Sequence, residues 1–222
     1  MTERTSPSVA TVDRGVEEGA TPSNRVDGGA MGMVIADQSV SLDGFSAGSN
    51  VRVGNGMGDG GEALHEWMFP AGEDAGKVYE DKFEGTGAVI VGRRMFDVGE
   101  EPWGDDPPFH RPVFVVTHRP KEPIVKQGGT TYTFVTDGLD TTLARAREAA
   151  GGKDVVVLGG ADVIRQCIKG GLLDELQLHL AHVLLGGGTR FFGDLDAASA
   201  AFERTRVIDG EGVTHIRFRL VK

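Results

Sequence analysis

The sequence predicts an α/β fold built on a mostly parallel central sheet of eight strands, with an antiparallel hairpin at its C-terminal end. Two observations lead to this prediction. Apolar runs typical of strands alternate with helix-like stretches through most of the chain, and such alternation favours a parallel sheet. Near the C-terminus, by contrast, two strand-like segments are separated only by residues 209–212 (DGEG), which is a hairpin signal.

The clearest structural unit lies within residues 154–192. Residues 155–158 form a short apolar run, typical of a strand buried on both faces. Gly159 and Gly160 follow at once, and the apolar residues of 163–168 recur with the spacing of an amphipathic helix. Apolar and polar residues then alternate over 176–180, which predicts a second strand. The unit is therefore a strand–helix–strand crossover whose first turn has no side chains.

The remaining elements follow from apolar runs, periodicity and turn residues. Residues 47–61 are mostly Gly, Asn and Asp, and predict a long flexible loop of the kind that often forms a functional lid. Residues 100–111 are rich in proline and predict an irregular segment. Strands are predicted at 33–36, 88–91, 113–116, 132–135, 201–208 and 213–221, and helices at 62–69, 74–83, 92–96 and 139–150.

The composition excludes several classes of function. The chain has 222 residues, which suits a single domain, and a net charge of −10, which argues against a nucleic-acid partner. Its one cysteine, Cys167, excludes an internal disulfide and falls on the apolar face of a predicted helix, so we expect a buried thiol. No run reaches the roughly 20 apolar residues of a membrane span. No apolar stretch marks a secretory signal, so we expect a cytoplasmic protein without a membrane partner.

Residues 1–30 differ in composition from the rest of the chain. They are rich in Thr, Ser, Gly, Glu and Asp and show no apolar periodicity. A segment of this kind cannot bury enough apolar surface to fold by itself. We therefore expect a disordered N-terminal extension that carries no chemistry, followed by one folded domain over residues 31–222.

Three predicted strands end in polar or Gly-rich turns, at residues 92–94, 117–119 and 159–161. Because the carboxyl ends of parallel strands meet at one edge of a sheet, the three turns should lie together where α/β proteins bind ligands. Two turns supply arginines and the third supplies a helix N-terminus, which suits a ligand with several phosphates. A dinucleotide fits best, although surface arginines near strand ends are also common.

Gly159 and Gly160 admit two interpretations. A turn without side chains lets a phosphate approach the backbone N–H groups of a helix N-terminus, where the helix dipole favours negative charge. Alternatively, the glycines only let the helix pack tightly on the strand. The turn has no G-x-G-x-x-G sequence and the chain has no G-x-x-x-x-G-K-[ST] sequence, so neither standard nucleotide fingerprint decides between them.

Six short segments occur in an order that resembles the dihydrofolate reductase-like superfamily. They are SLDGF at 41–45, VGRRMF at 91–96, VVTHR at 115–119, VLGGA at 157–161, LLDEL at 172–176 and VLLGGGTRFF at 183–192. The most similar branch is the reductase domain of the bifunctional riboflavin-biosynthesis deaminase–reductase, with its single-domain relatives. The resemblance covers about residues 33–222 and implies a three-layer dihydrofolate reductase-like fold.

The resemblance also implies NADPH as the hydride donor. The residues that would hold its adenosine side, including the 2′-phosphate, are Gly92, Arg93, Arg94, Met95, Thr117, His118 and Arg119. Those that would hold the pyrophosphate are Gly159, Gly160, Ala161, Asp162 and Val163. Those that would border the nicotinamide and the substrate are Ala36, Ser41, Leu42, Asp43 and Phe45.

The sequence departs from the family pattern in three respects. His182 stands where many relatives have proline, and His118 occupies a turn position that is often Ser or Asn. The chain also lacks the H-x-E…P-C-x-x-C zinc motif of the deaminase half, which a single cysteine cannot build.

Hydride transfer is the chemistry of the cofactor, which leaves the protein to supply position and a proton. The candidate acids are Asp43, after the first strand, and Glu62 and Glu66, after the long loop. Each also has a structural interpretation, since Asp43 would shape a turn and the two glutamates would lie on a solvated helix face. His179 and His182 lie three residues apart on a predicted strand and point to opposite faces, so we expect no metal site.

The sequence therefore predicts an NADPH-dependent reductase of a small pterin-like or pyrimidine-like heterocycle. The resemblance implies a substrate like that of 5-amino-6-(5-phosphoribosylamino)uracil reductase in riboflavin biosynthesis. Dihydrofolate reductase activity, or nucleotide binding without turnover, are the alternatives. Because the family often dimerises through its terminal strands, we expect a homodimer with apolar contacts from Phe202, Val207, Ile216 and Phe218.

Overall fold

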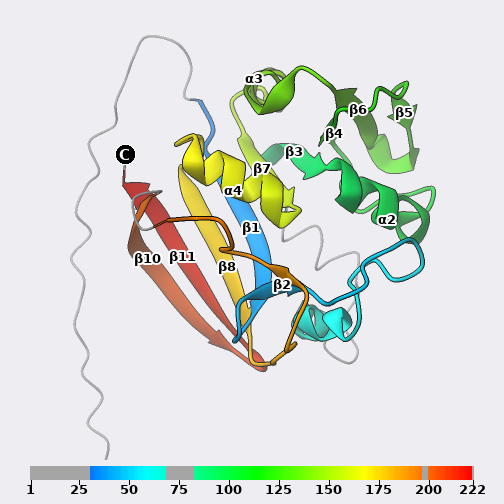
Figure 1. Cartoon of the computed structure of the whole chain (residues 1–222). Helices are drawn as coiled ribbons and strands as arrows, with labels where there is room; N and C mark the ends of the chain where they lie inside the picture. The colour runs from blue at the N-terminus through cyan, green and yellow to red at the C-terminus, as the bar shows by residue number, and fades with distance from the viewer. Residues whose placement is uncertain (1–30, 69–82, 197–199, 222) are drawn as a thin grey trace, which may run out of the picture.

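The computed structural model describes residues 31–68, 83–196 and 200–221 of the chain (Figure 1). Its strands are β1 (Val34–Ser41), β2 (Phe45–Ala47), β3 (Thr86–Gly92), β4 (Pro112–Val116), β5 (Ile124–Val125), β6 (Thr131–Val135), β7 (Asp154–Gly159), β8 (Glu175–Ala181), β9 (Thr189–Arg190), β10 (Ala201–Gly210) and β11 (Val213–Val221). Its α-helices are α2 (Arg93–Trp103), α3 (Gly138–Ala150) and α4 (Ala161–Lys169), and its 3-10 turns are η1 (Gly61–Leu64), η2 (Glu66–Met68) and η3 (Gln127–Gly129).

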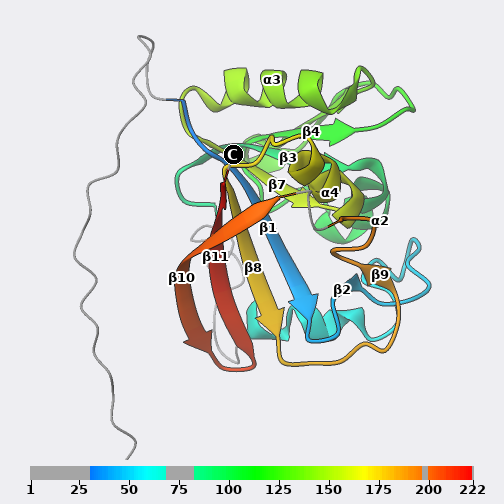
Figure 2. The same ribbon diagram turned by 60° about the vertical axis from the view of Figure 1, so that its left-hand side comes forward.

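The described strands form a nine-stranded main sheet in the order β10-β11-β8-β1-β7-β3-β4-β6-β5, and β2 pairs with β9 in a second, two-stranded sheet. The pairs from β8 through β1, β7, β3 and β4 to β6 are parallel. The β10–β11 hairpin and its pairing with β8 are antiparallel, as is β5 with β6. Figure 2 shows β10, β11, β8 and β1 side by side in that order. The predicted α/β fold with a C-terminal hairpin is confirmed.

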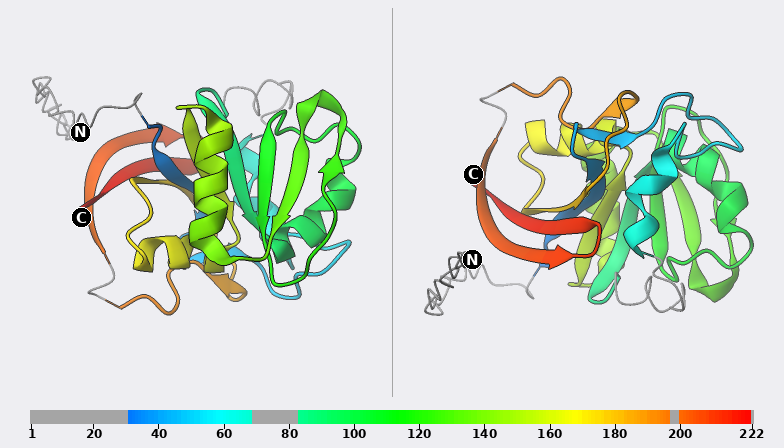
Figure 3. Two further views of the ribbon diagram at one scale, coloured as in Figure 1. Left: turned by 90° about the horizontal axis from the view of Figure 1, so that it is seen from above. Right: turned by 90° about the horizontal axis from the view of Figure 1, so that it is seen from below.

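Consecutive residues of the central strands point to opposite faces of the sheet and are apolar on both. Helices therefore cover both faces. On β3, Ala88 and Ile90 belong to a buried cluster with residues of α3 and α4. Val89 and Val91, which point the other way, pack in a second cluster with Phe96 of α2. The fold therefore has three layers, and Figure 3 shows α3 lying across the strands when it is seen from above.

The connections that leave two neighbouring strands, β3 and β7, run in opposite directions along the sheet. Their register pairs Val91 with Gly159, so the two strands end side by side. Helix α2 leaves β3 for one face of the sheet, whereas α4 leaves β7 for the other face. A crevice outside the carboxyl ends of strands at such a switch point is the usual ligand site of an open α/β sheet.

Four local predictions need correction. The first strand continues from Val34 to Ser41, because Asp37, Ser39 and Ser41 alternate with less polar residues and still pack inside the protein. The predicted helix at 62–69 is a pair of 3-10 turns in its described part. Helix α2 continues to Trp103, with Pro102 in its last turn, so residues 100–103 are not irregular. The described main sheet has nine strands rather than the predicted eight, because the two-residue strand β5 is too short to give a sequence signal.

Two further expectations concern segments outside the described residues, namely the extension at 1–30 and the helix predicted at 74–83, of which only Phe83 is described. Cys167 is 1% exposed, and burial raises the pKa of its thiol to about 12, so the predicted buried thiol is confirmed. Among the described residues, no helix combines the length and the apolar character that crossing a membrane would need.

Candidate functional site

A cleft of about 1450 Å³ opens where β3, β4 and β7 end. One wall is formed by the strand-end turns that begin α2 and α4 and follow β4. The opposite wall comes from the loop at 51–57 and from the η1–η2 segment, and Asp37, Gln38 and Ser39 of β1 also line the space. Drug-sized ligands occupy pockets of roughly 300–1,000 Å³, so this cleft has room for a dinucleotide and a second small molecule.

The structure brings all three predicted turns to this cleft. The predicted cofactor residues that line it are Gly92, Arg93, Arg94, Met95, Thr117, His118, Arg119, Gly160, Ala161, Asp162 and Val163. Two others do not line it. Ala36 is completely buried and packs with the α3 and α4 cluster, and Gly159 is the last residue of β7.

Gly160 makes the start of α4 accessible from the cleft. It is the N-cap residue of α4 and has an ordinary φ of −62°. In the described part of the chain, a Cβ added at Gly160 would meet no heavy atom within 4 Å. Gly159 differs, because its φ is +112° and a Cβ there would lie 3.0 Å from Oε1 of Gln38. Gly160 thus leaves open space at a helix N-terminus, where backbone N–H groups and the helix dipole favour an anion.

The N-terminus of α2 lies beside that of α4. Its N-cap residue is Gly92, whose Cβ, if present, would lie 3.0 Å from Cγ2 of Val163 and 3.4 Å from the backbone nitrogen of Gly160. A side chain at Gly92 would therefore be in tight contact with the first turn of α4, and Val163 would have to shift slightly to accept it. Without it, two positive helix ends face the same cleft.

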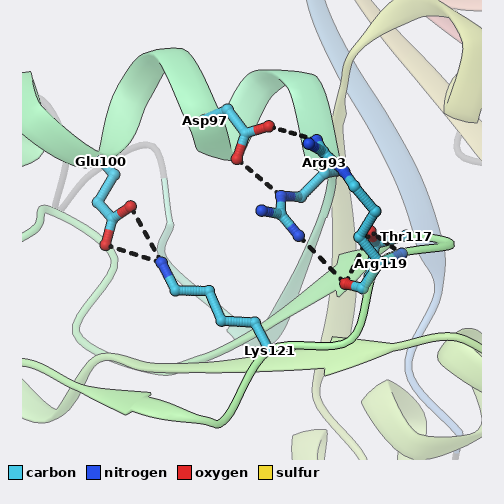
Figure 4. Close-up of polar contacts among 6 residues, drawn as sticks. All are labelled: Arg93, Asp97, Glu100, Thr117, Arg119 and Lys121. Carbon is cyan, nitrogen blue, oxygen red and sulfur yellow. Dashed lines mark hydrogen bonds and ion pairs between the residues drawn. The ribbon is translucent and has the colours of Figure 1, made fainter.

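Two arginines at this end of the cleft share one carboxylate (Figure 4). Arg93 Nε donates to Oδ1 of Asp97 at 2.7 Å, and Arg119 Nη2 donates to Oδ2 at 2.6 Å. Arg93 Nη1 also donates to the backbone carbonyl of Arg119 at 3.1 Å. Burial raises the pKa of Asp97, but the hydrogen bonds and charges of the two arginines outweigh burial and hold that pKa below its usual range. The three charged groups together carry one net positive charge.

The turn after β4 is held by Thr117, whose Oγ1 accepts a hydrogen bond from the backbone nitrogen of Arg119 at 2.9 Å. Nearby, Lys121 forms an ion pair with Glu100, with Nζ 3.3 Å from Oε2 (Figure 4). The same Nζ lies 5.0 Å from the ring centroid of Phe96. These contacts fix where the cations of this end stand before any ligand arrives.

Arg94 connects the cleft wall to the long loop at 47–61. Its Nη2 donates to the backbone carbonyl of Val51 at 3.1 Å. Within the loop, Ser49 pairs with Asp59 as an antiparallel bridge, and Asn50 Nδ2 donates to Oδ2 of Asp59 at 2.6 Å. The predicted lid is therefore tied to itself and to the first turn of α2.

Asp43 lies outside the cleft lining and anchors another segment. Its carboxylate accepts hydrogen bonds from Ser41 Oγ at 2.6 Å, from the backbone nitrogen of Leu185 at 3.1 Å and from that of Gly186 at 2.7 Å. These bonds, with that of Ser41 largest, lower its pKa to about 2 against the opposing effect of burial. An acid that is ionised throughout the neutral range is poorly suited to donate a proton, so the geometry supports the structural interpretation of Asp43.

The predicted substrate segment is also displaced from the cleft. Ser41, Leu42 and Phe45 are not among the lining residues, whereas the next two residues, Ser46 and Ala47, are. The other candidate acids, Glu62 and Glu66, do line the cleft, together with His65 between them. The structure therefore brings the two glutamates, but not Asp43, to the same space as the predicted cofactor residues.

Sequence reasoning missed a polar group that begins at the cleft. Asp37 of β1 contacts His179 of β8, and His179 contacts His215 of β11. A signal was present, because Asp37, Ser39 and Ser41 alternate along β1 as a polar face on a strand with buried neighbours. In the described ranges, no group of three or more His, Cys, Asp or Glu side chains is arranged to hold a metal ion.

Comparison with known proteins gives a consistent set of matches. The sequence matches the RibD C-terminal domain family over residues 32–218. It is 26% identical over 168 residues to the Bacillus subtilis (strain 168) protein named uncharacterized protein YyaP, a match that covers 73% of this chain and 81% of that protein.

Solved structures with the same fold include a protein of Shewanella sp. PV-4 provisionally named as a riboflavin biosynthesis protein. Its TM-score is 0.64 at 23% identity, over 86% of this chain and 99% of that one. Dihydrofolate reductase from Enterococcus faecalis, complexed with NADP(H) and RAB-propyl, has a TM-score of 0.55 at 16% identity, over 87% of this chain and 99% of that one. These likenesses show a dihydrofolate reductase-like fold.

The environment of Asp43 predicts a pH-dependent contribution to stability. A carboxyl whose pKa is about 2 in the folded protein, below the usual value of ~3.9, stabilises the fold above pH ~4 and loses this effect as pH falls towards 2. Asp43→Asn should therefore melt below the wild type at pH 6, and the difference should shrink between pH 4 and pH ~2. Thermal denaturation by circular dichroism measures it. Asp209→Asn, at an exposed position in the hairpin, is the control. A melting-temperature difference between Asp43→Asn and the wild type that does not vary with pH would refute this explanation.

Proposed function

The chain belongs to the RibD C-terminal domain family, and from this premise we propose that it is an NADPH-dependent reductase of a small heterocycle. The substrate would be similar to that of 5-amino-6-(5-phosphoribosylamino)uracil reductase. The observation that carries the proposal is the cleft at the β3–β7 switch point, where two helix N-termini and a pair of arginines face one large space. Phosphates and a planar heterocycle are the ligands that such a space accommodates.

The residues present fit a nicotinamide dinucleotide. The open position at Gly160 lets a pyrophosphate approach the N-terminus of α4. Arg93 and Arg119 would bind a 2′-phosphate, because the planar guanidinium matches phosphate geometry. When bound, the reduced cofactor supplies a hydride. The chain itself orients the two ligands, excludes water and provides a proton.

Asp97 would act on cofactor choice through the arginines it holds. Its carboxylate fixes both guanidinium groups within 2.7 Å before a ligand binds, which lowers the entropy cost of ordering them. Its negative charge also offsets half of the positive charge that a 2′-phosphate would meet. The remaining net charge still favours a phosphate over a 2′-hydroxyl.

Two alternatives remain under the same fold, namely dihydrofolate reductase activity and nucleotide binding without turnover. We expect NADPH oxidation, followed at 340 nm, with 5-amino-6-(5-phosphoribosylamino)uracil and not with 7,8-dihydrofolate. Turnover of dihydrofolate alone would favour the first alternative. NADPH binding without oxidation by either compound would favour the second and contradict a reductase.

Replacing Gly160 separates cofactor binding from backbone strain. A methyl group at this position fits the ligand-free protein, because the φ is ordinary and the space is open, but it would stand where a pyrophosphate approaches. Gly160→Ala should therefore keep the melting temperature of the ligand-free protein and lose most of the increase that NADPH causes. Gly159→Ala is the matched control. With a φ of +112° it should lower the ligand-free stability by ~1 kcal/mol or more. A Gly160→Ala protein that keeps the full NADPH shift would exclude this pyrophosphate site.

The arginine pair should determine selectivity for NADPH over NADH. A charged hydrogen bond contributes roughly 1.5–3 kcal/mol, so Arg93→Ala or Arg119→Ala should weaken NADPH binding by about tenfold or more. NADH, which has a hydroxyl in place of the 2′-phosphate, should bind nearly as before. Calorimetric titration measures both affinities, with Arg145→Ala on α3 as a control. Equal affinity of the wild type for the two cofactors would contradict the proposal.

A homodimer through the terminal hairpin is also proposed. Strand β10 forms one edge of the main sheet, and its apolar side chains Phe202, Val207 and Ile208 are 38%, 47% and 41% exposed. An exposed edge strand with apolar side chains is a ready surface for a second copy. Light scattering at micromolar concentration should give twice the chain mass, and Val207→Glu should reduce it towards one chain. A wild-type monomer mass would refute the dimer.

A further inference from the structure

We propose that Asp37, His179 and His215 form an acid group that delivers a proton to the substrate end of the cleft. The proposal rests on the proposed reductase function and adds the source of the proton. Asp37 lines the cleft, His179 lies behind it, and His215 lies behind His179 on the next strand. The proposal assigns the proton to this group rather than to the candidate acids Asp43, Glu62 and Glu66.

The pairing of three adjacent strands brings the group together. In the registers of the sheet, Ser39 of β1 lies opposite His179 of β8, and His179 lies opposite His215 of β11. Asp37 is two residues before Ser39 and so shares its face of β1. Leu176 and Leu178 of β8 belong to the cluster on the α3 and α4 face, which places His179 on the opposite face.

The distances define a hydrogen-bonded chain. Nε2 of His179 lies 3.3 Å from Oδ2 of Asp37, and Nδ1 of His179 lies 2.6 Å from Nδ1 of His215. Two imidazole nitrogens at this distance can have only one proton between them, because one must donate and the other must accept. The histidine pair can therefore hold at most one extra positive charge without breaking its contact. When His179 carries the extra proton, its Nδ1 donates to Nδ1 of His215, and its Nε2 donates to the carboxylate of Asp37.

The surroundings shield these hydrogen-bonded side chains from water. His179 is 8% exposed, and the side chain of Asp37 is 14% exposed. The ring of Trp67 lies 4.7 Å from that of His179 and 4.8 Å from that of His215, centroid to centroid. Figure 3 shows the segment that carries Trp67, in cyan, beside the strands when the molecule is seen from below. Trp67 is itself held by a 2.8 Å hydrogen bond from Nε1 to the carbonyl of Leu64.

Other charged groups face the same region and will influence its protonation. On β8 and β11, Glu175 and Arg217 form an ion pair at 2.5 Å, which leaves no net charge from that pair. From the η1–η2 segment, Glu62, His65 and Glu66 line the cleft with Asp37.

The proton balance of the reduction defines what this group must do. Saturating a C=N or C=O bond of the substrate takes a hydride at carbon, from the bound reduced nicotinamide, and a proton at nitrogen or oxygen. His179 passes its Nε2 proton to the carboxylate of Asp37, and Asp37 passes a proton to the substrate. His179 is left neutral, and it regains a proton from water once the product has left. Asp37 is thus the catalytic residue, His179 its proton donor and His215 a positioning residue that holds the orientation of His179.

The first test needs no ligand. In protein labelled with ¹⁵N on histidine, a scalar coupling between Nδ1 of His179 and Nδ1 of His215 should show the shared proton. His215→Phe, which keeps a ring against Trp67, should abolish the coupling, whereas His182→Phe should leave it unchanged. His182 is a matched control because its Nε2 contacts Oγ1 of Thr214 at 2.9 Å and takes no part in the Asp37–His179–His215 group. A wild-type spectrum without the coupling at any pH from 5 to 8 would overturn the proposal.

The second test measures proton delivery with NADPH and 5-amino-6-(5-phosphoribosylamino)uracil as probes. The wild-type kcat should fall as pH rises, because the acid must be protonated. Asp37→Asn should lower kcat by about 100-fold or more, as removal of a general acid does, while NADPH affinity stays within about twofold. His215→Phe should change the pH profile of kcat and leave KM nearly unchanged, and His182→Phe should match the wild type.

The outcomes of the two tests are distinguishable. Turnover that survives in Asp37→Asn with the wild-type pH profile would overturn the acid role and leave the reductase function in place. If the wild type oxidises no NADPH with 5-amino-6-(5-phosphoribosylamino)uracil, the proposed substrate class is wrong, and so is proton delivery to such a substrate. The ¹⁵N coupling, measured without ligand, would still report whether the hydrogen-bonded chain itself exists.

Discussion

The close approach of β3 to the first turn of α4 is the constraint on which the site depends. Gly92 makes it possible, since a Cβ at that position would lie 3.0 Å from Val163 and 3.4 Å from the backbone nitrogen of Gly160. The β3–β7 register then aligns the two strand ends, and α2 and α4 depart to opposite faces. Two helix N-termini therefore face one crevice, although the protein as a whole carries a net charge of −10.

The cleft has two chemically different ends. At one end, Arg93 and Arg119 are held by Asp97 beside the helix N-termini, an arrangement suited to phosphates. At the other end, the polar face of β1 leads through Asp37 to the histidines of β8 and β11. A ligand with an anionic half and a reactive planar half would lie along the cleft with its phosphates at the arginines. This order places the proton-donating group where a hydride acceptor would bind.

The sequence predicted the parallel sheet, the hairpin and the three turns because each has a local signal, either an apolar run or a polar or Gly-rich turn that follows one. The polar face of β1 was a signal for Asp37 alone. The contacts that link it to His179 and His215 span three strands and arise only from strand order and register. Ala36 was expected to border the nicotinamide, but it is the neighbouring residue Asp37 that lines the cleft. A shift of one residue along a strand moves the side chain to the opposite face of the sheet. Asp43 was one candidate acid, from its place after the first strand, and a turn-shaping residue was the alternative. Its hydrogen bonds to Leu185 and Gly186 depend on a segment remote in sequence.

The proposed reductase function requires that this cleft bind a nicotinamide dinucleotide in one orientation. The most direct measurement is a crystal structure of the protein soaked with NADPH. We expect the pyrophosphate at the backbone of Gly160 and Ala161, the 2′-phosphate between Arg93 and Arg119, and the nicotinamide ring near Asp37. A nucleotide bound elsewhere, or bound in the reverse direction with its 2′-phosphate near Asp37, would contradict it.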